Sequence, residues 1–306
     1  MTDVVVDLGK TRCRARSDDG VAEAPGSPGL ASPAGVLAAL ASIAGAVRET
    51  GAVRAADAVR AADAVGAADG GRIGRIAVGA AGALTDPVAA EQLAQRLSAE
   101  YGGPQAAVTS DALTAHLGAL AGAGGVVVVA GTGAVAVAVD DDGKVAVADG
   151  LGPVDGDLGS GGWIGAEMIA RAAAYGRWAD VVARRIGRDW RELVGDRSYE
   201  HVRLRASLVP DLAALARSGD ADAIALVEEA AGALASTASE AAGQVGDVRE
   251  VAVVGGLTGL GPLLLRPLGE ALGDLRLRAA VGDALDGAAL LLDRNDLPHE
   301  AHVHRA

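Results

Sequence analysis

Two aspartates follow short apolar runs that are typical of buried strands. Asp7 closes the run that begins at Val4, and Asp111 follows the run at residues 106–109 and opens a helical pattern. A carboxylate at such a strand end can hold Mg²⁺, often through water. It can also accept a hydroxyl proton as a general base, which phosphoryl transfer to an alcohol requires. Turn capping by Asp7 and a helix-dipole contact by Asp111 are the structural alternatives, and spacing alone does not decide between them.

Three glycine turns each follow a strand pattern, and they suit phosphate binding. They are Gly9-Lys10-Thr11, Gly131-Thr132-Gly133 and Gly255-Gly256. Glycine lets backbone amides approach phosphate oxygens closely, and threonine adds a hydroxyl donor. One such turn is weak evidence, because glycine ends strands in many proteins. Three of them, in two similar halves of the chain, predict phosphate binding together.

Two common nucleotide-binding motifs do not match. The P-loop pattern would need glycine at the position of Val4, which lies inside the first apolar run. No G-x-G-x-x-G follows that run either, so the sequence does not support a Rossmann dinucleotide site.

The densest signal is the glycine-rich segment 150–165, which also contains Asp155 and Asp157. So many glycines exclude a regular element, and loops of this kind often carry function. A flexible linker is disfavoured because Trp163 and Ile164 require burial. We expect Trp163 to pack beneath the loop.

Composition excludes several classes of protein. Half of the 306 residues are apolar, which is enough to bury a core and excludes whole-chain disorder. Cys13 is the single cysteine, so a disulfide framework is impossible and a reducing compartment is expected; we interpret Cys13 itself as a small strand residue. A formal charge of −13 argues against nucleic acid or an anionic membrane as the main partner.

The N-terminal residues and the longest apolar stretch indicate a cytoplasmic protein. Met1 leads directly into a strand pattern, without a secretory signal. The stretch 126–139 is shorter than the roughly 20 residues that a membrane-spanning helix needs, and a Gly-Thr-Gly turn interrupts it.

The elements that must position these residues form two similar series. Each half reads as a strand, a glycine turn, a hairpin with an acidic-glycine turn, and then alternating helices and strands, which predicts an α/β protein of two related domains. We place the boundary at 122–125, with domains 1–121 and 122–306, and a helix from about residue 290 that can return to the first domain. The repeat at 53–70 is interpreted as slippage that lengthened a helix or its exit loop. The last eight residues, with three histidines, are expected to be a frayed tail rather than a metal site.

Taken together, these motifs resemble the BadF/BadG/BcrA/BcrD-type ATPase and N-acetylglucosamine kinase family of the actin and sugar-kinase superfamily. The matching residues, in order, are Asp7-x-Gly9-x-Thr11-x-Cys13, Ser110-Asp111-Ala112, Gly131-Thr132-Gly133, Gly150-x-Gly152-Pro153, Gly156-Asp157-x-Gly159-Ser160, Trp163-Ile164-Gly165 and Val254-Gly255-Gly256. The resemblance covers nearly the whole chain, and the loop around Asp157 is its most specific part.

The resemblance implies two ribonuclease H-like domains with ATP in an interdomain cleft. Asp111 would be the catalytic base, and Asp7 would lie near Mg²⁺. Phosphates would contact Gly9, Lys10, Thr11, Gly131, Thr132 and Gly133, while Gly255 and Gly256 would contact adenosine. Gly150, Asp157 and Ser110 would bind the sugar, with N-acetylglucosamine and transfer to its 6-hydroxyl as the family expectation. A homodimer is also expected.

The chain departs from the family at several positions. Ser110 replaces a usual Asn, Leu158 replaces a usual Glu, and the segment 26–32 lacks the Asn that contacts the sugar in relatives. Two other functions therefore stay open. One is a non-catalytic sugar- or nucleotide-sensing protein, and the other is the ATPase activator of a radical dehydratase, which needs more thiolates than Cys13 offers to hold its iron–sulfur cluster.

Overall fold

The computed structural model describes residues 1–52, 73–101 and 105–306, so the repeat at 53–70 lies outside the described residues. The chain divides into two compact units, residues 1–123 with 281–306, and residues 124–280. The second segment of the first unit begins at Val281, whereas the sequence placed the return of the chain at about residue 290.

The first unit contains a six-stranded mixed sheet in the order β11-β5-β4-β1-β2-β3. Its strands are β1 (Thr2–Leu8), β2 (Arg12–Ser17), β3 (Gly20–Pro25), β4 (Ile73–Ala80), β5 (Gln105–Thr109) and β11 (His304–Arg305). β1, β4 and β5 run parallel, whereas β2, β3 and β11 pair antiparallel with their neighbours.

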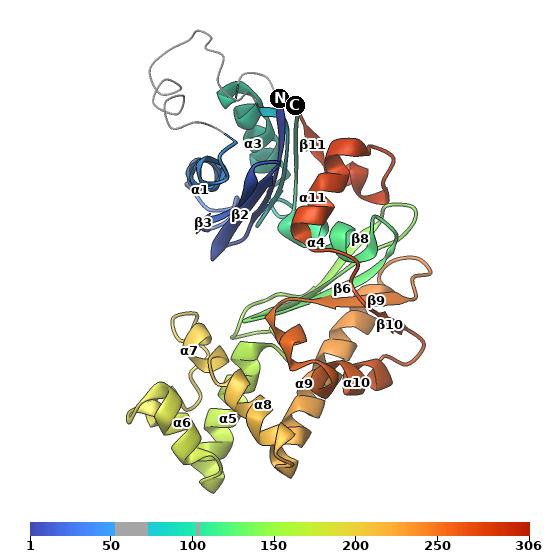
Figure 1. Ribbon diagram of the computed structural model, residues 1–306. Coiled ribbons are helices and arrows are strands. Elements are labelled where there is room, and N and C mark those ends of the chain that lie inside the picture. Colours follow the sequence, from blue (N-terminus) through green and yellow to red (C-terminus); the bar gives the residue numbers. More distant parts are fainter. Residues whose placement is uncertain (53–72, 102–104) are drawn as a thin grey trace. The chain divides into compact units, whose positions relative to one another are not determined.

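Alternation along β1 gives this sheet two buried faces. Val4 and Val6 pack in one apolar cluster and Val5 in another, as the two-residue period of a strand requires. Helices α1 and α3 cover the first face and α4 and α11 cover the second (Figure 1). Their bounds are α1 (Gly35–Glu49), α3 (Pro87–Glu100), α4 (Asp111–Leu120) and α11 (Ala284–Asp293).

The C-terminal residues are ordered, so the prediction of a frayed tail is wrong. A 3₁₀ turn, η3 (Pro298–His302), leads into β11, which pairs with β5 and so extends the sheet. The side chain of His299 is fully buried. The tail is ordered because its backbone forms hydrogen bonds with the edge of the sheet. Its polar composition gave no indication of this pairing.

The second unit repeats the strand order of the first. Its sheet has the order β10-β9-β6-β7-β8, which corresponds to β5-β4-β1-β2-β3. Its strands are β6 (Gly125–Ala130), β7 (Ala134–Val139), β8 (Val145–Asp149), β9 (Glu250–Val254) and β10 (Arg276–Arg278). The predicted α/β fold of two related, ribonuclease H-like domains is confirmed.

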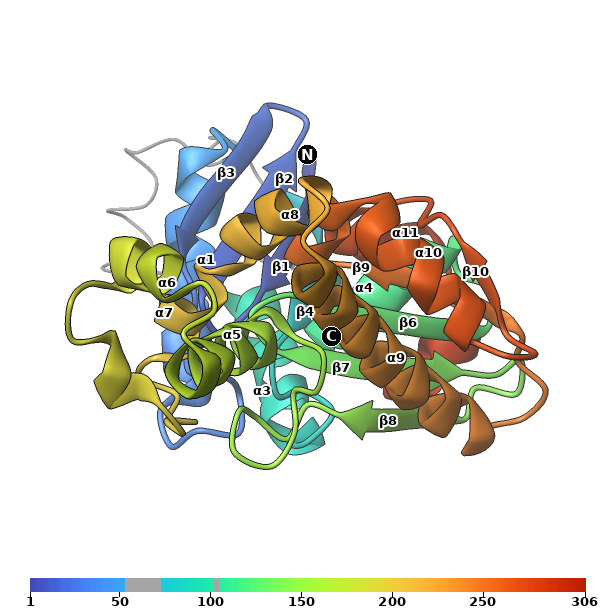
Figure 2. The same ribbon diagram turned by 90° about the horizontal axis from the view of Figure 1, so that it is seen from below.

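Helix α9 lies across β6, β7 and β8 on one face of this sheet (Figure 2). A large cluster of alanine, valine and leucine side chains fills the space between them. The helices of the unit are α5 (Gly161–Tyr175), α6 (Ala179–Ile186), α7 (Val202–Ala206), α8 (Val209–Arg217), α9 (Ala221–Gly243) and α10 (Pro262–Ala271), with 3₁₀ turns η1 (Trp190–Leu193) and η2 (Gly256–Leu260). Because α5 begins at Gly161, capped by Ser160, the prediction that the segment 150–165 contains no regular element is wrong for its last five residues.

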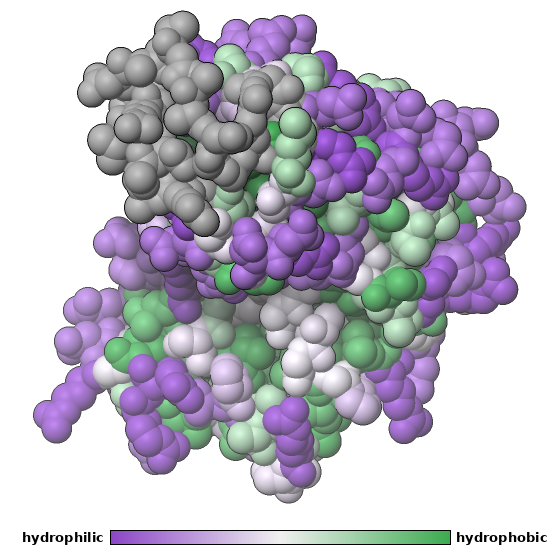
Figure 3. All heavy atoms as spheres, turned by 45° about the horizontal axis from the view of Figure 1, so that its top comes forward, coloured by the Kyte–Doolittle hydropathy of each residue, from purple (hydrophilic) through white to green (hydrophobic). Residues whose placement is uncertain are grey.

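Hydrophilic side chains cover much of the surface visible in Figure 3, and apolar side chains are exposed in places between them. Within the described residues, no helix combines the length and the apolar character that a membrane crossing requires.

Candidate active site

The two predicted aspartates lie at one edge of the first sheet. Because β1, β4 and β5 run parallel, their carboxyl ends share an edge, and the register aligns Asp7 with Gly79 and Gly79 with Thr109. Ser110 and Asp111 follow Thr109 directly and begin α4. Open α/β sheets place their ligand sites at this edge.

Asp111 is held at the first turn of α4 by neighbouring donors. The N–H of Ala112 donates to Asp111 Oδ1 at 2.9 Å, and the hydroxyl of Ser110 donates to the same oxygen at 3.3 Å. The pKa of Asp111 is raised to about 6, first by desolvation and then by the negative charge of Asp7. The two hydrogen bonds and the positive charge of Lys10 oppose this rise. A carboxylate with such a pKa can take up a proton near neutral pH.

Arg14 links Asp7 to the start of α11, which sequence reasoning missed. Its Nε and Nη2 donate to Asp7 Oδ2 at 3.1 and 2.8 Å, and its Nη1 donates to Asp283 Oδ2 at 2.7 Å. Asp283 is also the N-cap of α11. The guanidinium therefore fixes the orientation of the Asp7 carboxylate.

The arrangement at Asp7 fits a magnesium ion that is coordinated mainly by the phosphate oxygens of a bound small molecule and by water. Among the described residues, no three His, Cys, Asp or Glu side chains gather as a metal site. Mg²⁺ does not need one, because it commonly uses one or two carboxylates together with phosphate oxygens and waters. Both hydrogen bonds from Arg14 fall on Oδ2 of Asp7, and neither engages Oδ1. One carboxylate oxygen is thus placed to hold such an ion directly or through water.

The first glycine turn is tightly folded against a second loop. Gly9 N donates to Arg12 O at 3.0 Å, and Gly26 N donates to Thr11 O at 3.1 Å. A Cβ on Gly26 would lie 2.4 Å from Gly9 O, so only glycine fits there. Lys10 is exposed on this turn, and its charge lowers the pKa of Asp111.

Small residues hold α4 close to its neighbours. A Cβ on Gly79 would lie 2.0 Å from Thr114 Oγ1, and one on Gly287 would lie 1.9 Å from the Thr114 carbonyl oxygen. A Cβ on Gly118 would meet Asp283 O at 1.8 Å. Helix α4, which carries Asp111, is therefore packed backbone to backbone against α11.

The C-terminal tail also contacts the helix that carries Asp111. His299 Nε2 lies 2.8 Å from His116 Nδ1, and Thr109 Oγ1 donates to His302 O at 2.7 Å. Burial lowers the pKa of His299 to about 3, with smaller contributions from His116 and His302. The imidazole ring of His299 is therefore uncharged near neutral pH. The three tail histidines gave no signal for this role, because their partners lie far away in sequence.

In the second unit, the turn at Gly131, Thr132 and Gly133 joins β6 to β7 and receives the start of α5. Gly161 N donates to Gly131 O at 2.8 Å, and Gly162 N donates to Thr132 O at 2.9 Å. The side chain of Thr132 stays exposed. The turn is thus rigidly supported while its outer surface remains open to a ligand.

Asp157 and Gly150 lie beside this turn. Asp157 Oδ1 accepts the N–H of Ala134 at 3.0 Å, and Gly150 N donates to Ala134 O at 3.0 Å. Asp149, which sequence reasoning missed, accepts the N–H groups of Asp157 and Leu158 at 2.6 and 2.8 Å. Its position at the end of a strand and before a glycine was the available signal.

Gly255 and Gly256 follow β9, the parallel neighbour of β6. Gly255 has a φ of 100°, and a Cβ there would lie 2.4 Å from Ala130 O, so the turn requires glycine. Beyond it, a cavity of about 820 Å³ lies between η2, α9 and α10. Ile224, Val227 and Leu260 give it apolar walls, and Arg217 and Arg266 add positive charge.

The residues thus form two groups, one in each unit. Asp7, Gly9, Lys10, Thr11, Ser110 and Asp111 lie at the edge of the first sheet, and the glycines of the second and third turns lie with Asp157 and Gly150 at the edge of the second. Ser110, expected to contact substrate, is the N-cap of α4, its hydroxyl accepting from Ala112 N at 3.1 Å.

Comparison with known proteins gives one family. The model of the BadF/BadG/BcrA/BcrD ATPase family matches residues 6–266. Among curated proteins, no sequence matches the chain.

Solved structures of sugar kinases share the fold. A Chromobacterium violaceum protein assigned as an N-acetylglucosamine kinase is 26% identical with a TM-score of 0.63, the match covering 95% of this chain and 98% of that one. A Porphyromonas gingivalis protein with the same assignment is 16% identical with a TM-score of 0.64, over 96% and 98% of the two chains. A glucokinase of the ROK family from Streptomyces griseus, solved with glucose and AMPPNP, is 20% identical with a TM-score of 0.57, over 95% and 99%.

Proposed function

We propose that this chain, which belongs to the BadF/BadG/BcrA/BcrD ATPase family, is an ATP-dependent kinase that phosphorylates the 6-hydroxyl of an amino sugar. N-acetylglucosamine is the substrate we expect, because the Chromobacterium violaceum protein is assigned as an N-acetylglucosamine kinase and matches this chain over nearly its full length.

The observation that carries this proposal is the environment of Asp111. Its pKa of about 6 leaves the carboxylate mostly ionised at neutral pH while keeping it basic enough to accept a proton. In the proposed reaction, Asp111 takes the proton of the sugar hydroxyl as its oxygen attacks the γ-phosphorus of ATP. The bond from that phosphorus to the β–γ bridging oxygen breaks, and ADP leaves.

The remaining residues bind and orient. We assign Lys10 and the amides of Gly9 and Thr11 to the phosphates, together with the turn from Gly131 to Gly133. Asp7, oriented by Arg14, would hold Mg²⁺, which when bound offsets phosphate charge. Asp157 and Gly150 are assigned to sugar hydroxyls.

The cavity beyond Gly255 and Gly256 is the proposed adenosine site. Its volume of about 820 Å³ falls within the range of small-ligand pockets. Apolar walls from Ile224, Val227 and Leu260 suit a flat base, and its arginines suit the phosphates that follow. The homodimer and the cytoplasmic location that the sequence indicates stay predictions.

The activator function is disfavoured by the state of Cys13. This single cysteine is completely buried, and burial together with the charge of Asp7 raises the pKa of its thiol to about 12. Ligation of an iron–sulfur cluster needs several accessible thiolates. A sensing protein without turnover has no specific observation in its favour.

The test is a coupled ATP assay with the intact protein and Mg²⁺ over a panel of sugars. The panel contains N-acetylglucosamine, glucosamine, N-acetylmannosamine, N-acetylmuramate and glucose, and the product is located by ³¹P NMR. We expect ATP-dependent formation of a 6-phosphate from an amino sugar. Calorimetric sugar binding without turnover of any sugar would instead identify a sensor.

A further inference from the structure

Asp149 is the last residue of β8, and its carboxylate closes the loop that carries Asp157. Its Oδ1 accepts the N–H of Asp157 at 2.6 Å, and its Oδ2 accepts the N–H of Leu158 at 2.8 Å. A third and longer contact joins Oδ1 to the N–H of Leu151 at 3.5 Å. Hydrogen bonds to an ionised acceptor are stronger than bonds between neutral groups, so this carboxylate holds the two ends of the loop together.

The backbone at both aspartates has a conformation that few residues adopt. Asp149 has a φ of 62° and Asp157 has a φ of 55°, and only Ala121 and Trp178 share a positive φ among the other described residues that are not glycine. Such backbone is unfavourable for a residue with a side chain, and it persists where surrounding contacts hold it, often at functional sites. The carboxylate of Asp149 supplies such a contact to Asp157.

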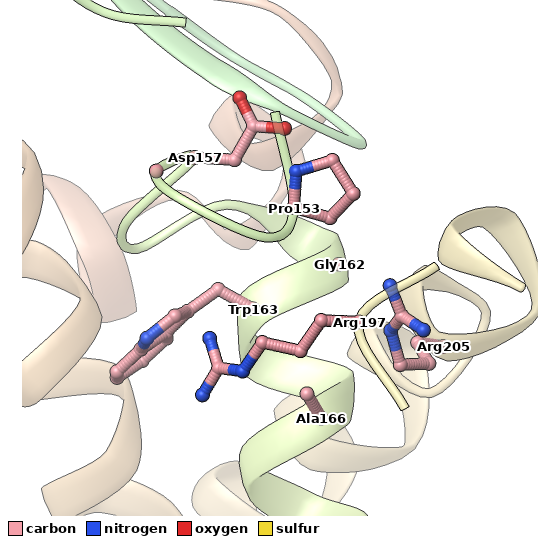
Figure 4. A pocket seen from close by; sticks show the side chains of 8 residues that line it. Pro153, Asp157, Gly162, Trp163, Ala166, Arg197 and Arg205 are labelled. Carbon is pink, nitrogen blue, oxygen red and sulfur yellow. The ribbon is translucent and has the colours of Figure 1, made fainter. Parts of the chain in front are cut away.

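Gly156 leaves room for this carboxylate. A Cβ on Gly156 would lie 2.2 Å from Asp149 Oδ1, so a side chain there would push the carboxylate out of place. Asp157 in turn contacts the start of β7, because its Oδ1 accepts the N–H of Ala134 at 3.0 Å. Figure 4 shows the Asp157 carboxylate directed away from Trp163, in agreement with this bond. A series of hydrogen bonds thus leads from Asp149 through Asp157 to β7.

We infer that Asp149 is a positioning residue for sugar binding, which acts by holding Asp157 in the orientation that meets the sugar hydroxyls. The inference rests on the proposed function, which assigns Asp157 to those hydroxyls. Asp149→Asn keeps one acceptor oxygen but sets an NH₂ group against an N–H donor, so one of the two short bonds is lost. The loop that carries Asp157 then has to be ordered when the sugar binds, and this ordering lowers the affinity.

Isothermal titration calorimetry on the intact protein tests this role, with the sugars of the panel above and with AMPPNP and Mg²⁺ as probes. Asp149→Asn should raise the dissociation constant of the sugar about tenfold and leave that of AMPPNP within about twofold of wild type. Asp140→Asn is the matched control. The Asp140 carboxylate, at the other end of the β7–β8 hairpin, likewise accepts the N–H groups of Lys144 and Gly246 at 2.9 and 2.8 Å. Its replacement should lower stability but leave sugar binding unchanged.

A double substitution separates positioning from a general loss of structure. If Asp149 acts through Asp157, adding Asp149→Asn to Asp157→Asn should weaken sugar binding by less than about twofold, because the side chain that is positioned has already been changed. If Asp149→Asn does not fold, Asp149→Gly takes its place, since glycine adopts a φ of 62° without strain and removes only the carboxylate.

These outcomes are distinct from those of the kinase assay, because binding is measured without turnover. The inference is overturned by wild-type affinity for sugar in the folded variant of Asp149, by an equal loss in Asp140→Asn, by additive losses in the double substitution, or by no sugar binding to wild type. Weakened binding in a protein that phosphorylates none of the sugars would uphold the role of Asp149 and refute the kinase. Turnover with a KM for sugar that Asp149→Asn leaves unchanged would do the reverse.

Discussion

The surroundings of a single residue, Asp111, determine how readily its carboxylate takes up a proton. Desolvation and the nearby charge of Asp7 raise its pKa to about 6, while the hydroxyl of Ser110 and the N–H of Ala112 limit the rise. The same carboxylate in water would be a much weaker base. The local environment is thus what makes this aspartate suitable for proton transfer.

This tuning predicts the pH dependence of activity. The base must be ionised to accept a proton, so kcat/KM should fall as pH drops through about 6 and level off above it. Steady-state rates measured from pH 5 to 8 check the midpoint. A flat profile over that range would remove Asp111 as the base.

Replacing the cap residue should move that midpoint. Ser110→Ala removes a hydrogen bond that lowers the pKa of Asp111, so the midpoint should shift to higher pH. Ser160→Ala is the matched control, because Ser160 caps α5 in the same way and lies in the other unit. Each change should cost about 1 kcal/mol of unfolding free energy through the lost cap, but Ser160→Ala should leave the pH profile in place.

Lys10 allows a test of where the phosphates of ATP bind. The chain has two lysines, Lys10 on the first glycine turn and Lys144 on an acidic hairpin, and both are exposed. Lys10→Ala should raise the dissociation constant for ATP about tenfold, because it removes the positive charge that we assign to the phosphates. It should leave sugar binding nearly unchanged. Lys144→Ala should change neither constant. Equal effects of the two substitutions on ATP would place the phosphates elsewhere.

At the scale of elements, the close packing of α4 against α11 holds the proposed base in place. Gly118 and Gly287 let the two helix backbones approach, and Arg14 ties the start of α11 to Asp7. The contacts between α4 and α11 and the bond from Arg14 to Asp283 join residues more than 150 positions apart, so no local pattern could predict them. The strands and the helix start at Asp111 were predictable, because their apolar periodicity and caps are local.

Adding one methyl group at this contact should be costly. In Gly287→Ala the new Cβ would meet the Thr114 carbonyl oxygen at 1.9 Å, so α4 and α11 must separate. We expect a loss of about 1–3 kcal/mol in unfolding free energy together with a lower kcat. Gly232→Ala in α9 meets nothing within 4 Å, and should instead be neutral or stabilise by up to about 1 kcal/mol. Urea denaturation of both variants would show whether the two substitutions differ in this way.

The buried tail makes stability depend on pH through His299. Its pKa is about 3 in the folded protein and near 6.5 when unfolded, so below pH 6.5 the unfolded chain binds the extra proton and the folded state loses stability. Relative to His299→Gln, wild-type stability should fall by up to about 1.4 kcal/mol per pH unit from 6.5 toward 3. Paired denaturation curves at pH 7 and pH 5 measure this difference. A stability gap that does not change with pH would contradict burial of the neutral ring.

In the molecule as a whole, the division into two related α/β units is what the sequence predicted best. Two runs of strand, glycine turn and acidic hairpin are visible in the residues, and the two sheets share one strand order. The role of the chain's end was not predictable, because β11 pairs with β5 and His299 lies against His116, and both partners are far away in sequence.

We propose that this molecule transfers phosphate to a sugar hydroxyl with Asp111 as the base. The measurement that tests this role is kcat for sugar phosphorylation in Asp111→Asn beside Asp86→Asn, the same exchange at the N-cap of α3. Asp111→Asn should lower kcat by about 100-fold or more with nucleotide affinity within about twofold of wild type, and Asp86→Asn should keep both. Turnover of Asp111→Asn equal to that of Asp86→Asn would show that Asp111 is not the base.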